Sequence, residues 1–510
     1  MDKKRSVLNV TISIISKIVM LILAIVVRRI LIDNAGNDAN GVFSLYTNII
    51  GFLAIAELGV GTAINFSIYK PIVQGDTKKV AALYNLYKKV YLVIGIIIGI
   101  LGLAIIPALP QLAKDYNSSF SLALTFGIML IDVVLTYAYS SKTSLINAYK
   151  NNYITTLFTF IKTVTYSVIQ IVVLIATQSF ELYLIARVIS TLLEWLMTNI
   201  YARKHYGDVI NTKEKIDEET KKEVVKNTKA MFMHKIGAVF VTTTDSIIIS
   251  AFIGVVTLGL YTNYVVIASA VLGILQLFFT PLTSIVGHLC AEGNTEEQLK
   301  YFNLMYYFNF TIGIIFFLGF YAIADNLVAI CFGKDLVMDF SISLIIAINY
   351  FIQYMRTTAL LFKDATGTFY YDRWKPVVEG VVNIILSIAL VNVLGIVGVI
   401  IATIATNIFI CHIVDPYVLY KHGFKQKMGN YYLINYSLVL IFVACIAVLH
   451  FVKVSLESVF LELVVNGCIA VGIALVPIII MFIVFKQYRE NVKIFFGWIK
   501  KVADKIFKKH

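Results

Sequence analysis

The sequence predicts an all-α membrane protein that crosses the bilayer many times. Of its 510 residues, 59% are hydrophobic and only 14% are charged, and the mean hydropathy is +0.83. Average soluble domains carry about 25% charged residues. Runs such as 90–110, 432–452 and 459–485 reach the roughly 20 apolar residues that a helix needs to cross a bilayer, and they have no polar face. These runs exclude a soluble helical protein.

The apolar segments predict about 14 transmembrane helices, and the basic residues predict how these are oriented. Most of the 43 Lys and Arg residues fall in alternate loops. Because positively charged loops face the cytoplasm, we expect both termini there. The predicted spans lie at 8–31, 42–66, 88–110, 119–141, 154–177, 181–202, 230–252, 259–288, 302–324, 337–362, 376–392, 395–415, 432–452 and 459–485.

The net charge of +13 follows from this topology rather than from a nucleic-acid site. A nucleic-acid-binding surface would gather basic residues and aromatic residues on one soluble face. Here the basic residues are spread over many short loops, where anionic lipid headgroups are their expected partners.

Motifs of hydrolytic enzymes and metal sites are missing from the sequence. There is no GxxxxGK[ST] phosphate loop and no HExxH, and the five cysteines form no CxxC pair. Every predicted external loop is short, and no internal loop could hold a catalytic domain. We therefore expect a protein that is not an enzyme, with no metal and no cofactor beyond a possible coupling ion, H⁺ or Na⁺.

A six-residue phrase occurs twice, each time at the start of an apolar span. Residues 41–46 read GVFSLY and residues 259–264 read GLYTNY. The copies begin the second and the eighth predicted span, so they occupy equivalent places in two sets of six. Chance is a rival explanation, but the equivalent location favours a duplication with two pseudo-symmetric six-helix bundles. The predicted domains are an N-terminal bundle at 1–202, a charged cytoplasmic linker at 203–229, a C-terminal bundle at 230–420, two added spans at 421–485 and a basic amphipathic tail at 486–510.

Several stretches resemble a known transporter family. They are the repeated phrase, AELGVGTAI at 56–64, TTTDSIIISAFIG at 242–254, and the segment 364–403 with DATGTFYYDRWKPVVEGVVNIILS and LGIVGVIIAT. The chain resembles the polysaccharide-transport branch of the multidrug/oligosaccharidyl-lipid/polysaccharide (MOP) exporter superfamily.

This resemblance implies a fold, a cargo and a location. The fold is two six-helix bundles in a V around a central cavity, with two C-terminal helices. The activity is translocation of an undecaprenyl-pyrophosphate-linked oligosaccharide from the cytoplasmic to the outer leaflet of a bacterial cell membrane, by alternating access. The implied partners are this lipid-linked cargo, membrane lipids, and a polysaccharide polymerase or glycosyltransferases.

Seven cationic residues within or at the ends of the spans are the candidates for binding a pyrophosphate. Arg offers paired hydrogen bonds to phosphate, and Lys acts as a point charge. Snorkelling to the interface is an equal explanation for those near a helix end, whereas Lys17 and Lys162 lie deeper and favour the cavity. The candidates are Lys17, Arg28, Arg29, Lys162, Arg187, Lys235 and Arg356.

Four acidic residues in the spans are the candidates for ion coupling. A buried carboxylate without a cation has a raised affinity for protons, which is one way to build a proton-coupled site. A static ion pair between helices is the alternative. The candidates are Glu57, Asp132, Glu194 and Asp245, whereas Glu379 and Asp415 lie near cytoplasmic ends and are interpreted as interfacial residues.

The first rival function is a multidrug exporter of the same superfamily, which would carry organic cations by antiport. Such a protein favours carboxylates in its cavity, and the seven cations lean instead toward an anionic cargo. The second rival, a membrane polymerase, ligase or glycosyltransferase, lacks the large loop or domain that it would need.

Overall fold

The computed structural model describes residues 2–57, 60–279, 282–486 and 488–490, and helices account for nearly all of this part of the chain. No strand occurs among these residues. The chain divides into two compact units, Met1–Leu260 and Tyr261–His510, each with its own set of packed helices. The domain ranges predicted from the sequence remain a prediction.

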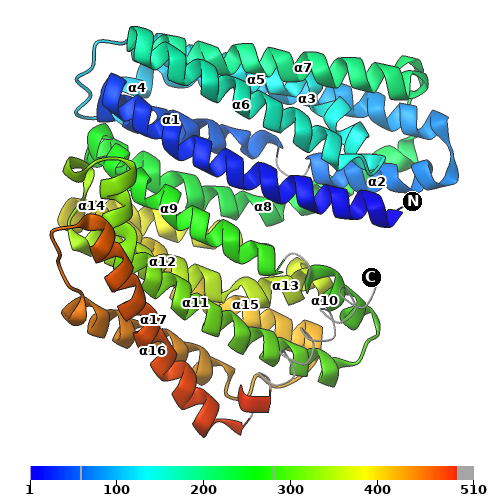
Figure 1. Cartoon of the computed structure of the whole chain (residues 1–510). Helices are drawn as coiled ribbons and strands as arrows, with labels where there is room; N and C mark the ends of the chain where they lie inside the picture. Colours follow the sequence, from blue (N-terminus) through cyan, green and yellow to red (C-terminus); the bar gives the residue numbers. More distant parts are fainter. Residues whose placement is uncertain (1, 58–59, 280–281, 487, 491–510) are drawn as a thin grey trace. The chain divides into compact units, whose positions relative to one another are not determined.

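Unit 1 is built around helices that pack side by side along most of their length. Helices α5, α6 and α7 pack on one another, α3 packs on α5, and α1 packs on α6 and α8 (Figure 1). Its main helices are α1 (Asp2–Leu53), α2 (Val60–Gln74), α3 (Thr77–Ile105), α4 (Leu109–Leu112), α5 (Leu122–Ala148), α6 (Asn152–Thr177), α7 (Phe180–Asn211) and α8 (Glu218–Phe252).

Unit 2 is centred on one long helix, α11, which packs against α12, α16 and α17. Helix α9 begins in unit 1 and continues into unit 2. The helices from that point on are α9 (Val255–Phe279), α10 (Leu282–Ala291), α11 (Thr295–Cys331), α12 (Phe340–Met355), α13 (Thr357–Thr366), α14 (Lys375–Thr406), α15 (His412–Val418), α16 (Tyr431–Val452) and α17 (Val459–Val484).

Short polar residues begin many of these helices by accepting a hydrogen bond from the first turn. Ser121 begins α5, Ser179 begins α7 and Asp217 begins α8 in this way. Such a cap satisfies a backbone N–H that the helix itself leaves without a partner. The hydrogen bonds that Thr220 donates also lower the pKa of the Asp217 carboxyl.

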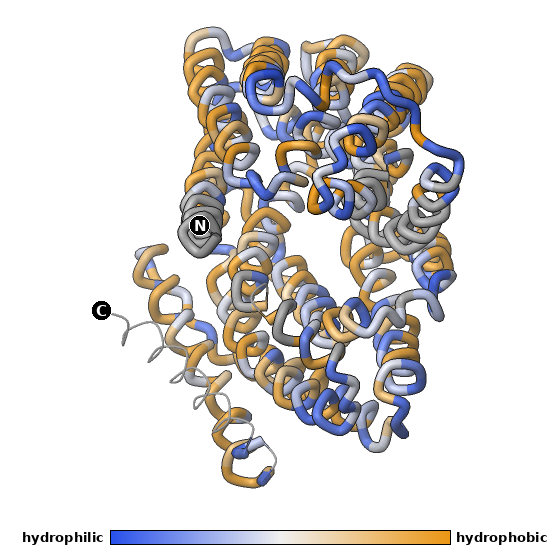
Figure 2. The backbone as a smooth tube through the Cα atoms, turned by 90° about the vertical axis from the view of Figure 1, so that its right-hand side faces the viewer, coloured by the Kyte–Doolittle hydropathy of each residue, from blue (hydrophilic) through white to orange (hydrophobic). Residues whose placement is uncertain are grey.

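The outer faces of the helices are apolar, as expected for a membrane protein. On α3 the exposed side chains Leu92, Ile96, Ile100 and Leu103 follow one helical face. Figure 2 shows hydrophobic residues along most helices, with hydrophilic residues gathered toward turns and helix ends. Nine helices within the described ranges are long and apolar enough to cross a membrane. An exposed apolar surface of this extent is suited to lipid and not to water.

Two long helices are broken at glycines close to places where the sequence predicts a turn between spans. Gly36 in α1 has φ 84° and Gly395 in α14 has φ 59°. Residues other than Gly rarely adopt positive φ angles, so glycine is the residue expected at a sharp break in a helix. The breaks fall between the predicted spans 8–31 and 42–66, and at the start of span 395–415. The total of 14 spans remains a prediction.

The repeated glycines of the phrase meet at a close helix crossing within unit 1. A Cβ placed on Gly41 would lie 1.9 Å from the carbonyl O of Val255, and one placed on Gly259 would lie 2.8 Å from the carbonyl O of Asn37. Each glycine therefore packs against the carbonyl group of the residue that lies four positions before the other glycine. Asn37 Nδ2 donates to Val256 O at 2.8 Å, and Asn40 Nδ2 donates to Gly259 O at 3.0 Å.

The tyrosine that ends each copy of the phrase makes equivalent contacts in its own unit. Tyr46 donates to the carbonyl O of Leu122, at the start of α5, at 2.8 Å. Tyr264 accepts from the backbone N of Met338, just before α12, at 3.0 Å. In each case the tyrosine ties the phrase to the fourth predicted span of its half.

Candidate functional site

Lys162 and Glu194, both predicted site residues, form a buried ion pair between α6 and α7. Lys162 Nζ lies 3.1 Å from Glu194 Oε2. The same carboxylate accepts hydrogen bonds from Tyr139 at 2.6 Å and Thr159 at 2.8 Å. Both of its oxygens are thus occupied by groups from two neighbouring helices, α5 and α6.

Arg187 and Asp132, also predicted, form a second pair between α7 and α5. Arg187 Nε lies 3.3 Å from Asp132 Oδ2, and Thr191 donates to the other oxygen. The Arg187 guanidinium also lies 5.3 Å from the ring centre of Phe43 and 5.5 Å from that of Tyr166. Aromatic faces attract a cation at these distances, so the rings fix the guanidinium in place.

Arg28 of α1 belongs to the same region as Arg187. Its Nη2 donates to Ser44 Oγ at 3.4 Å, and both arginines act electrostatically on the hydroxyl of Tyr183. Phe43 and Ser44 are the third and fourth residues of GVFSLY, so this copy of the phrase contacts both arginines. We call Arg28, Arg187, Asp132, Phe43 and Tyr183 the arginine cluster; in it Arg187 pairs with Asp132, and Arg28 bonds to Ser44.

The remaining predicted residues of unit 1 lie on α1 and α8, except for Glu57. Arg29 pairs with Asp33 one turn along α1 at 2.6 Å, and both side chains are exposed. Lys17 is exposed on α1, and Asp245 is half-buried in α8 beside the buried Thr243 and Thr244. The side chain of Lys235 lies outside the described residues.

Glu57 differs from the other predicted carboxylates in its partner and its backbone. It accepts a hydrogen bond from Tyr137 at 2.9 Å, and it ends a 3₁₀ segment, Ala54–Glu57, that follows α1. A 3₁₀ stretch in the middle of a predicted span often marks a hinge or a functional position. No ion pair to Glu57 occurs among the residues that the structure describes.

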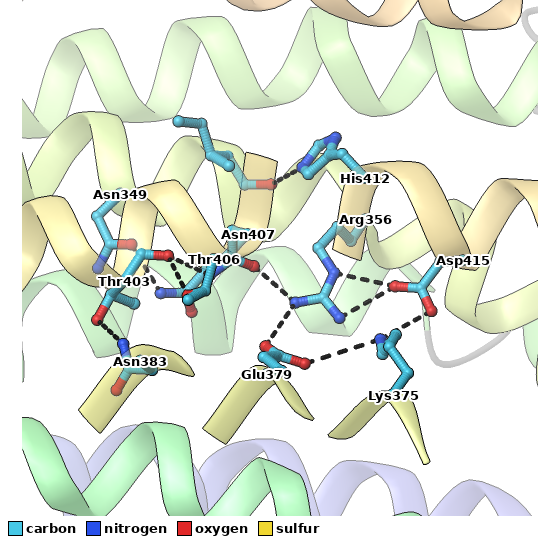
Figure 3. Close-up of polar contacts among 12 residues, drawn as sticks. Asn349, Arg356, Lys375, Glu379, Asn383, Thr403, Thr406, Asn407, His412 and Asp415 are labelled. Carbon is cyan, nitrogen blue, oxygen red and sulfur yellow. Dashed lines mark hydrogen bonds and ion pairs between the residues drawn. The ribbon is translucent and has the colours of Figure 1, made fainter. Parts of the chain in front are cut away.

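Arg356, the predicted cation of unit 2, belongs to a larger buried ion network. It lies at the break between α12 and α13, where it caps the first and begins the second. Arg356 Nη2 lies 3.0 Å from Asp415 Oδ2, and Nη1 donates to Asn407 Oδ1 at 2.6 Å (Figure 3). Asn407 begins a π-helical turn, Asn407–Cys411, and such turns are frequent at functional sites.

Asp415 is fully buried and is the carboxylate on which three cations converge. Besides Arg356, Lys363 Nζ lies 2.7 Å and Lys375 Nζ lies 2.9 Å from Asp415 Oδ1. Asp372 pairs with Lys363, and Glu379 lies 3.7 Å from Arg356 and 3.8 Å from Lys375. Three cations thus face three carboxylates, and we call these six residues the Asp415 network. The formal charges of the six residues balance, and their ion pairs link α12 and α13 to α14 and α15.

Uncharged polar groups extend the network along α14 and α15. Asn383 Nδ2 donates to Thr403 Oγ1 at 2.9 Å, and this bond joins the two halves of α14, before and after the break at Gly395. His412 lies 2.9 Å from the carbonyl O of Ile352 and 3.2 Å from Asn435 Oδ1. Figure 3 shows Thr403, Asn407, Arg356 and Asp415 following one another from left to right.

Glu379 and Asp415 are therefore not the interfacial residues that the sequence suggested. Both are buried, and Lys363, Asp372 and Lys375 join them although none was a predicted site residue. One signal in the sequence was available: Lys375, Glu379 and Asn383 recur every four residues in an otherwise apolar span. That spacing puts all three on one face of a helix.

No family model and no curated protein matches the chain. Its structure, however, resembles solved transporters. A lipid II flippase, MurJ, in an inward closed conformation, matches with a TM-score of 0.64 at 15% identity, over 92% of this chain and 98% of that one. An inward-facing multidrug resistance MATE family transporter of the MOP superfamily matches with a TM-score of 0.61 at 12% identity, over 81% and 97%.

The chain has the fold of the MOP superfamily. A further match is a MOP superfamily transporter from Pyrococcus furiosus, with a TM-score of 0.52 at 13% identity, over 83% of this chain and 97% of that one. Its description states that a binding pocket of reverse polarity suggests a different function. The structure thus bears out the predicted fold, and membership of the superfamily stays a prediction. The chain is a multi-pass membrane protein with this MOP fold, and the solved structures that share it are transporters.

Proposed function

We propose that this MOP-fold protein is a flippase for a lipid-linked oligosaccharide, which it moves from the cytoplasmic to the outer leaflet of a bacterial cell membrane. The observation that carries the proposal is the arginine cluster. Ionisable groups are costly within membrane spans, and Arg28 and Arg187 bring two guanidiniums to the neighbouring residues Ser44 and Phe43. A pyrophosphate between lipid and sugar would accept charge-assisted hydrogen bonds from both guanidiniums.

The alternative cargo, an organic cation, fits the cluster less well. Asp132 and Glu194, the carboxylates that could attract such a cation, are already paired with Arg187 and Lys162. Pocket polarity is also the feature by which the Pyrococcus furiosus transporter is described as functionally different. We therefore favour an anionic cargo on this fold.

The wider organisation that we propose follows the sequence. Fourteen spans in two duplicated six-helix halves and two added helices would place both termini in the cytoplasm. The equivalent roles of Tyr46 and Tyr264 support the duplication, as does the reciprocal packing of Gly41 and Gly259. The halves would alternate between inward- and outward-open states, with a polymerase or glycosyltransferases as partners that use or supply the cargo.

Removing the arginines is expected to stop transport of the lipid-linked cargo. Arg28→Gln or Arg187→Gln should each lower transport about tenfold or more, because each removes charge-assisted hydrogen bonds to phosphate. The measurement is the ratio of outer-leaflet to inner-leaflet lipid-linked precursor in cells. Lys204→Gln is the matched control, since Lys204 is exposed on the same helix as Arg187.

Two results would speak against this proposal. Normal precursor export in a correctly inserted Arg28→Gln/Arg187→Gln protein would remove the arginine cluster from cargo binding. Uptake of organic cations by proteoliposomes, with glycolipid export unaffected by either substitution, would favour the drug antiporter.

We also propose Glu57 as the carboxylate that binds the coupling ion, H⁺ or Na⁺. Its described partner is a hydroxyl rather than a cation, and it lies at a break in the helical backbone. Glu57→Gln should abolish the acceleration of transport by an imposed ion gradient while leaving slow, gradient-independent exchange. Asp132→Asn is the comparison, because Asp132 is paired with Arg187. Undiminished acceleration by both H⁺ and Na⁺ gradients in Glu57→Gln would refute this role.

A further inference from the structure

Exposed aromatic rings and basic groups gather at one end of unit 2. Tyr370, Tyr371 and Trp374, in the turn between α13 and α14, are 59%, 58% and 62% exposed. The Arg373 guanidinium lies 4.5 Å from the ring centre of Tyr370. These large side chains lie on the outside of the turn, with most of their surface free of the protein.

A second segment contributes to the same surface. The Tyr371 ring stacks on His422 at 3.8 Å, which joins the α13–α14 turn to the segment that follows α15. There Lys421 Nζ lies 5.3 Å from the ring centre of the exposed Tyr417 and donates to its hydroxyl. We call Tyr370, Tyr371, Arg373, Trp374, Tyr417 and Lys421 the aromatic–basic surface.

The Asp415 network fixes the inner side of this turn. Lys363 just before the turn binds Asp372 within it, and Lys375 just after it binds Asp415. Asp372 and Lys375 thus point inward, whereas Tyr371, Arg373 and Trp374 are exposed. Buried ion pairs therefore hold the turn in place, and the aromatic rings of its outer face take no part in these pairs.

The chemistry of the surface matches a lipid headgroup layer. Trp and Tyr prefer the membrane–water interface, where the ring meets apolar matter and its polar edge meets water. The exposed cations Arg373, Lys421, Lys425 and Lys427 outnumber the exposed Asp364 in these two segments. Basic residues at this level attract anionic headgroups.

We propose that the aromatic–basic surface binds the phosphate groups of anionic phospholipids in the adjacent leaflet. The rings enter the interface and the two cations beside them contact the headgroups. The surface is independent of the cargo, and it accounts for the exposure of Tyr370, Tyr371 and Trp374 beside the buried Asp372.

The test uses Trp374 as a reporter in the full-length protein. A single-tryptophan variant, Trp195→Phe/Trp498→Phe, is reconstituted in phosphatidylcholine vesicles with an equal minor fraction of brominated phosphatidylglycerol or brominated phosphatidylcholine. Bromine quenches tryptophan on contact. Brominated phosphatidylglycerol should quench Trp374 more strongly, because each basic residue near an anionic surface favours binding by about fivefold.

Charge removal then separates the headgroup preference from simple contact with lipid. Arg373→Gln/Lys421→Gln should make the two brominated lipids equally effective, with quenching by brominated phosphatidylcholine unchanged. Lys334→Gln, an exposed cation in another turn of unit 2, should keep the preference. Equal quenching in the parent variant would overturn the anionic preference, and no quenching by either lipid would overturn the whole proposal.

Discussion

Asp415→Ala should lower the apparent melting temperature of the purified protein by roughly 10 °C. Asp415 is fully buried and contacts Arg356, Lys363 and Lys375, so the substitution leaves three cations in the interior with one partner fewer. Removing one partner of a buried ion pair typically costs about 3–5 kcal/mol, and each kcal/mol shifts the melting temperature by about 2–4 °C at this size of unit.

The control and the rescue for this prediction come from the same unit. Asp335→Ala removes an exposed carboxylate and should leave the melting temperature within a degree or so of the parent. Adding Lys363→Met to Asp415→Ala should recover part of the loss, because it takes away one of the buried charges left without a partner. If the Asp415→Ala protein has the same melting temperature as the parent protein, the Asp415 network does not stabilise the packing of these helices.

Gly41→Val should disrupt the helix crossing between α1 and the start of α9. The Cβ would lie 1.9 Å from the carbonyl O of Val255, a backbone atom that cannot rotate away, so the helices must separate. We expect loss of transport and a melting temperature lowered by several degrees, as overpacking typically costs about 1–3 kcal/mol. Gly259→Val should act in the same direction, since its Cβ would lie 2.8 Å from the carbonyl O of Asn37.

Gly127→Ala in α5 is the matched control, because its Cβ would meet no atom within 4 Å. A direct measure of the crossing is a disulfide between Asn37→Cys and Val256→Cys in a background without the five native cysteines. The bond should form in the parent and fail in the Gly41→Val protein. Efficient cross-linking and transport in Gly41→Val would show that the crossing tolerates a side chain.

The sequence predicted the kinds of residue in unit 1 but not how they pair. Lys162, Glu194, Arg187 and Asp132 stood out because ionisable groups are rare in apolar spans. Their pairing depends on how α5, α6 and α7 pack, with partners 32 and 55 residues apart in the chain. Hydropathy alone does not contain that information, so the ion pair between helices could be named only as an alternative.

Apart from Arg356, the members of the Asp415 network were missed for a different reason. They lie close to predicted span ends, where charged residues normally face headgroups and water. Only the four-residue spacing of Lys375 and Glu379 pointed to a shared helix face. In the structure they are buried beside the helix break at Arg356 and the π-helical turn Asn407–Cys411. Likewise, the repeated phrase drew attention to Gly41 and Gly259, but their mutual packing is visible only in three dimensions.

The π-helical turn Asn407–Cys411 has a consequence for the register of the residues that follow it. An α-helix advances about 100° per residue, and a π turn accommodates one residue more. The turn thus absorbs the extra residue locally, so deleting one residue of the turn should leave Asp415 facing Arg356. Deleting a residue between the turn and Asp415, in α15, would instead rotate Asp415 by about 100°. Relatives without the extra residue would therefore keep their carboxylate at the place of Asp415 to neutralise the same three cations.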